Sequence, residues 1–97
     1  MSTPLDTSAY VAAQTAFETA AEEESKTRSA MATAQDHVTR LGPLPPSAVL
    51  KPSQIEDRAH LYATLARATT AHDAAVEDLT AKTTARDAAW ASLIAAA

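Results

Sequence analysis

The chain has 97 residues, of which 25 are alanine, five are proline, one is glycine and none is cysteine. Without cysteine it can form no disulfide, thiol nucleophile or thiolate metal site, and disulfides and metals are common supports of small domains. Twelve acidic and eight basic residues give a net charge of −4, so we expect no basic surface for nucleic acid. Asparagine is absent and lysine is scarce, a bias typical of GC-rich genomes that indicates a bacterium or its phage.

No segment near the N-terminus combines a basic stretch with an apolar run, and no stretch approaches the ~20 apolar residues that span a bilayer. We therefore expect a protein without a classical signal peptide or a transmembrane segment, and without a membrane partner. Its expected location is the cytoplasm at synthesis or, for a phage protein, the virion.

Proline and glycine divide the chain into two long segments. The first is predicted to be a helix over about residues 4–41, with the Thr3 hydroxyl as its cap and Pro4 at its first position. Gly42 and Pro43 predict its end, because glycine adopts the left-handed conformation that closes helices and proline cannot continue them.

Residues 42–52 form a predicted proline-rich loop that contains four of the five prolines. The loop is expected to be extended, with Leu44, Val49 and Leu50 folding back on the helix ends. The segment from Ser53 to Glu56 has the spacing of a capping box and predicts the start of a second helix, over about residues 53–97.

Both helical segments have apolar residues at alternating spacings of three and four. In the first segment these positions, apolar except at Glu24 and Thr27, are Tyr10, Ala13, Phe17, Ala20, Glu24, Thr27, Met31, Ala34, Val38 and Leu41. In the second the large apolar members are Ile55, Tyr62, Leu65, Val76, Leu79, Trp90 and Leu93, with polar interruptions at Arg58, Thr69, His72, Thr83 and Arg86. A mean spacing of 3.5 is typical of a coiled-coil seam. We predict one all-α domain, a long antiparallel two-helix hairpin that is coiled-coil-like and alanine-rich.

The polar interruptions suggest how the helices align. If Leu41 lies opposite Ile55, the aligned pairs are Met31 with Leu65, Phe17 with Leu79, Glu24 with His72 and Thr27 with Thr69. We predict that Glu24, Thr27, Thr69 and His72 form a polar layer that fixes the register, as buried polar residues do in coiled coils.

The last ten residues carry no charge and include Trp90, Leu93 and Ile94. One interpretation is that these three residues bind a protein partner, since an apolar helix end is a common anchor in helix-in-groove recognition. The other is that they close the hairpin's own core against Leu5 and Tyr10.

Candidate catalytic and metal-binding residues are few. Asp57 and His60 have the spacing by which one helix can hold a metal, with Glu56 one turn away, but a dinuclear bundle site needs a second such motif and two further carboxylates. We interpret these residues as a solvated surface. The chain is expected to have no catalytic, cofactor-binding or metal-binding residues and not to be an enzyme.

In size and layout the chain resembles the small Trp-x-Gly helical hairpins exported by type VII secretion. That family's motif lies in the turn, where this chain has Leu41 to Pro46, and the only tryptophan here is Trp90, so no functional residue is carried over.

The seam holds few large side chains for its length, so we expect the hairpin to be part of a homo-oligomer or a larger protein assembly. The favoured function is that of a structural or assembly protein, such as an accessory or scaffold component of a phage particle. The alternative is a binding module, such as a secreted type VII-like hairpin, an adaptor or an inhibitor, that uses its apolar C-terminal end.

Overall fold

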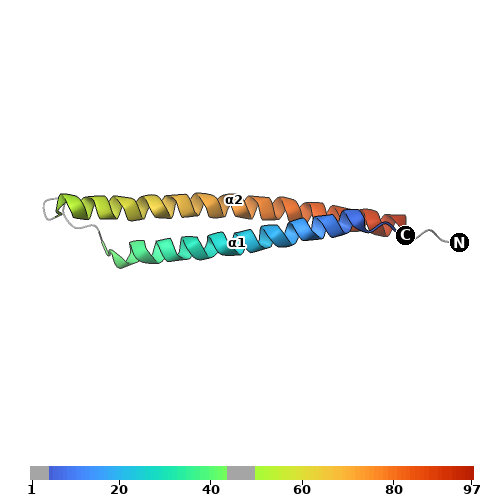
Figure 1. Cartoon of the computed structure of the whole chain (residues 1–97), viewed down its shortest axis with the longest axis horizontal. Helices are drawn as coiled ribbons and strands as arrows, with labels where there is room; N and C mark the ends of the chain where they lie inside the picture. Colours follow the sequence, from blue (N-terminus) through green and yellow to red (C-terminus); the bar gives the residue numbers. More distant parts are fainter. Residues whose placement is uncertain (1–4, 44–49) are drawn as a thin grey trace. The chain divides into compact units, whose positions relative to one another are not determined.

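The computed structural model describes residues 5–43 and 50–97, and two helices account for most of them. Helix α1 spans Ser8–Arg40 and helix α2 spans Pro52–Ala96 (Figure 1). The predicted all-α helical hairpin is therefore confirmed. In the described part of the chain, no helix is long and apolar enough to cross a membrane.

The chain divides into two compact units, and each contains part of both helices. Unit 1 consists of Met1–Ser25 and Ala74–Ala97, so it pairs the N-terminal part of α1 with the C-terminal part of α2. Unit 2 is Lys26–Asp73, which joins the rest of α1 to the first part of α2 through the connecting loop. Within each unit the two helix segments run antiparallel.

Helix α1 begins four residues later than predicted. The residues Leu5, Asp6 and Thr7 are not helical, and the first helical hydrogen bond runs from Val11 N–H to the carbonyl of Thr7 at 2.9 Å. Asp6 accepts hydrogen bonds from both the Ser8 backbone N–H, at 3.0 Å, and the Ser8 hydroxyl, at 2.6 Å. These two bonds, the hydroxyl first, lower the pKa of the Asp6 carboxyl below its ordinary value of 3.8. The predicted caps Thr3 and Pro4 lie outside the described residues.

The end of α1 follows the prediction. Gly42 has a φ of 71°, the left-handed conformation expected of the residue after a helix. The N–H groups of Leu41 and Gly42 donate to the carbonyls of Val38 and Thr39, each at 3.1 Å, so the last turn tightens before the chain leaves the helix.

The start of α2 corrects the predicted capping box. Pro52 is the first helical residue, and the Gln54 side chain accepts a hydrogen bond from the backbone N–H of Lys51 at 2.8 Å. Gln54, at the third helical position, thus makes the bond from side chain to backbone N–H that completes a capping box, a role that had been predicted for Glu56. Leu50 is half-buried as expected, whereas Leu44 and Val49 lie outside the described residues.

Very little of the chain is fully buried. Among the described residues the buried side chains are three alanines: Ala20, Ala34 and Ala75 are 4%, 5% and 7% exposed. No large side chain in the described part is completely buried. The helices are therefore held by half-buried side chains arranged around alanine contacts.

Candidate interaction surfaces

The face of α1 that packs on α2 is the predicted one. All ten seam positions of the first helix, from Tyr10 to Leu41, are buried or half-buried. Ala20 and Ala34 are the most buried residues of α1, and both belong to this seam. The spacing of three and four therefore located the packed face of α1 correctly.

The packed face of α2 differs from the prediction. Its seam consists of Arg58, Leu61, Leu65, Ala68, His72, Ala75, Leu79, Lys82, Arg86, Ala89 and Leu93, all buried or half-buried. Four predicted members are instead exposed: Ile55 by 49%, Tyr62 and Val76 by 42% each, and Trp90 by 50%. Leu65, Leu79 and Leu93 are half-buried as predicted. The predicted seam of α2 consisted of two columns, each a set of positions seven residues apart. The observed seam keeps the column that contains these three leucines, and a different column takes the place of the other.

The change of seam amounts to a rotation of α2 about its axis relative to the prediction, and alanine explains it. The column that replaces the large apolar residues includes Ala68, Ala75 and Ala89, whose small side chains let two helix backbones approach closely. The facing seam of α1 supplies bulk through residues such as Tyr10, Phe17 and Met31. The large residues of α2 consequently lie at the flank of the contact.

Two aromatic contacts join the helices within unit 1. The rings of Tyr10 and Trp90 have centroids 5.2 Å apart and are tilted by 55°, a favourable aromatic arrangement. The Arg86 guanidinium lies 4.0 Å from the centre of the Phe17 ring, within the range of a cation–π interaction. Arg86 also donates to Asp87 at 3.2 and 3.3 Å, which fixes the guanidinium beside the ring.

Arg58 joins the helices within unit 2. Its Nη2 atom donates to the Leu41 carbonyl at 3.1 Å and so occupies one of the acceptors left at the end of α1. The Nη1 atom of the same guanidinium is buried and has no hydrogen-bond partner in the described part of the chain. Leu50, Gln54 and Asp57 border this site, a groove of about 230 Å³.

The predicted polar layer remains a prediction. Glu24, Thr27, Thr69 and His72 are each half-buried on their own helices, but Glu24 falls in unit 1 and the other three fall in unit 2. The cross-helix contacts join Tyr10 to Trp90, Leu41 to Arg58 and Phe17 to Arg86, which lie four, three and seven positions beyond the predicted alignment.

The C-terminal end combines features of both interpretations. Trp90 contacts Tyr10 of α1, and Leu93 lines a groove of about 190 Å³ together with Leu5, Tyr10 and Ala89. Half of Trp90 nevertheless remains exposed, and Ile94 is 56% exposed. Trp90 and Leu93 thus contribute to packing within unit 1, while Trp90 and Ile94 present apolar surface.

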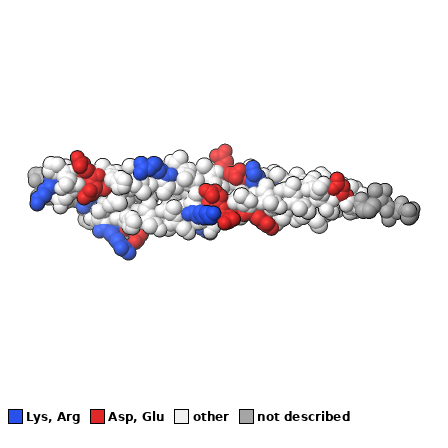
Figure 2. Space-filling view, viewed as in Figure 1, with Lys and Arg blue, Asp and Glu red and all other residues white. Residues whose placement is uncertain are grey.

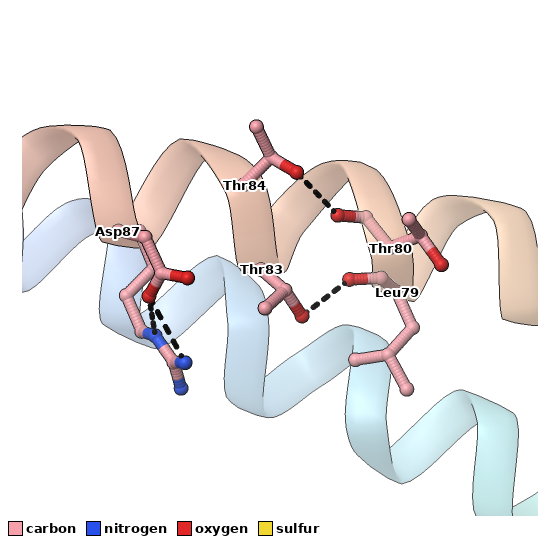
Figure 3. A network of polar contacts seen from close by, with 6 residues as sticks. Leu79, Thr80, Thr83, Thr84 and Asp87 are labelled. Carbon is pink, nitrogen blue, oxygen red and sulfur yellow. Dashed lines mark hydrogen bonds and ion pairs between the residues drawn. The ribbon is translucent and has the colours of Figure 1, made fainter.

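Threonines on the helices satisfy their own hydroxyl groups. Thr83 and Thr84 donate to the carbonyls four residues earlier, those of Leu79 and Thr80, at 2.8 and 3.1 Å (Figure 3). Thr15, Thr19, Thr64 and Thr80 make the same type of bond. Thr83 was a predicted seam position and lies beside the observed seam; with its hydroxyl bonded to its own helix, it requires no polar partner from α1.

On the face shown in Figure 2, charged side chains occur in small groups on a mostly uncharged surface. Arg40 pairs with Asp36 at 3.0 Å and Lys82 pairs with Asp78 at 3.2 Å, both at exposed sites where such pairs contribute little to stability. In residues 5–43 and 50–97 no group of three or more His, Asp or Glu side chains could hold a metal ion.

Arg58 and Arg86 are the residues whose roles the sequence did not reveal. Both occur where the heptad pattern expects an apolar residue, and the pattern alone classified them as interruptions. The signal that could have identified them is their position: Arg58 follows the loop within reach of the end of α1, and Arg86 belongs to the column shared with Leu79 and Leu93. Comparisons of the chain with protein-family models, curated proteins and solved structures found no match.

Proposed function

We propose that this protein is a non-enzymatic structural or assembly protein that acts through helix packing, as an accessory or scaffold component of a phage particle. The observation that carries the proposal is the burial pattern. Two helices of 33 and 45 residues bury three alanines in the described part of the chain and no large side chain. Helical stability in proteins comes mainly from packing an apolar face, so further packing partners would add to it.

The exposed surface is suited to packing against other helices. Seven large apolar side chains are between 42% and 56% exposed: Leu5, Val11, Ile55, Tyr62, Val76, Trp90 and Ile94. Many of the residues between them are alanines, or threonines whose hydroxyls are bonded within their own helix. Such surfaces require few polar partners from a neighbour.

A second candidate function is that of a binding module that uses its apolar C-terminal end. The exposure of Trp90 and Ile94, at 50% and 56%, supports this alternative. A single partner protein would then cover Trp90, Leu93 and Ile94, and the chain would not need to associate with itself.

Light scattering at several protein concentrations tests the main proposal. A structural component is expected to form a discrete species at a multiple of 10.1 kDa, whereas a monomer at every concentration would contradict the proposal. Ile94→Glu tests whether self-association uses the C-terminal end, because Ile94 is more exposed than Trp90 and has no part in the Tyr10 ring contact. Loss of assembly with unchanged circular dichroism would assign the assembly interface to that end. The alternative predicts instead that the chain alone is monomeric at every concentration, and a discrete oligomer that Ile94→Glu leaves intact would contradict it. Gene neighbours that encode virion proteins are the expected genomic context.

A further inference from the structure

We draw no further inference here: the strongest candidate, the exposed apolar groove that Leu50, Ile55, Ala59 and Tyr62 border at the start of α2, is an unpartnered surface, and nothing in the structure shows what covers it.

Discussion

The close packing of α1 against α2 through alanine can be tested by enlarging one buried alanine. Ala75 is 7% exposed on α2, and Ala74 beside it is exposed, so the two positions form a matched pair in unit 1. Ala75→Leu adds three heavy atoms at a helix contact, and overpacking of this kind costs about 1–3 kcal/mol. Ala74→Leu adds the same atoms where they face solvent, and its effect should stay within about 0.5 kcal/mol.

Thermal unfolding followed by circular dichroism measures the difference. For a domain of this size, 1 kcal/mol shifts the Tm by about 4–8 °C, so Ala75→Leu is expected to lower the Tm by about 4–24 °C. Protein concentration must be held constant, because association itself raises the Tm. Equal shifts for the two variants, or a higher Tm for Ala75→Leu, would refute a seam that depends on alanine at this position. Ala34→Leu and its exposed neighbour Ala32→Leu repeat the test in unit 2.

Three further predictions concern the helix end, the cap and the cation–π contact. Gly42→Ala should cost about 1 kcal/mol in thermal unfolding, because Gly42 has a φ of 71° and an added Cβ would meet no atom within 4 Å, leaving backbone strain as the cost. NMR titration should show a pKa for the Asp6 carboxyl below 3.8, and Ser8→Ala should raise it. Because the Asp6 carboxyl has a lower pKa in the folded state than in the unfolded state, the cap's contribution to stability is complete above the unfolded-state pKa. That contribution is lost as the pH falls through the folded-state pKa. An Asp6 pKa unaffected by Ser8→Ala would disprove the assigned cause. A double-mutant cycle of Arg86→Met and Phe17→Leu should give a coupling of about 0.5–1 kcal/mol, and additive effects would show that the contact contributes nothing.

The elements predicted most accurately are those with local signals. Gly42 is the only glycine of the chain, and its place before Pro43 predicted the end of α1. The α1 seam was predictable because a single face of that helix collects its large apolar residues other than Val11. The helix starts were predicted less accurately, since several polar residues near each start compete for the capping role. At α1 the Asp6 side chain bonds Ser8, and at α2 Gln54 bonds Lys51.

The α2 seam could not be predicted because two columns compete for the contact. The column through Leu65, Leu79 and Leu93 belongs to both alternatives, so the choice lay between large residues on one side and mostly alanine on the other. Side-chain size favours the column of Tyr62 and Trp90, yet the packed helices use the smaller one. Which column packs depends on the bulk that α1 presents, and that complementarity is not visible in the pattern of α2 alone.

The dependence of the melting temperature on protein concentration tests most directly whether the chain completes its packing through other copies. When folding is coupled to association, dilution favours the unfolded state. For two associated chains the Tm should rise by about 3–5 °C for each tenfold increase in concentration. A Tm that stays constant over a hundredfold range, with a mass of 10.1 kDa throughout, would contradict the account.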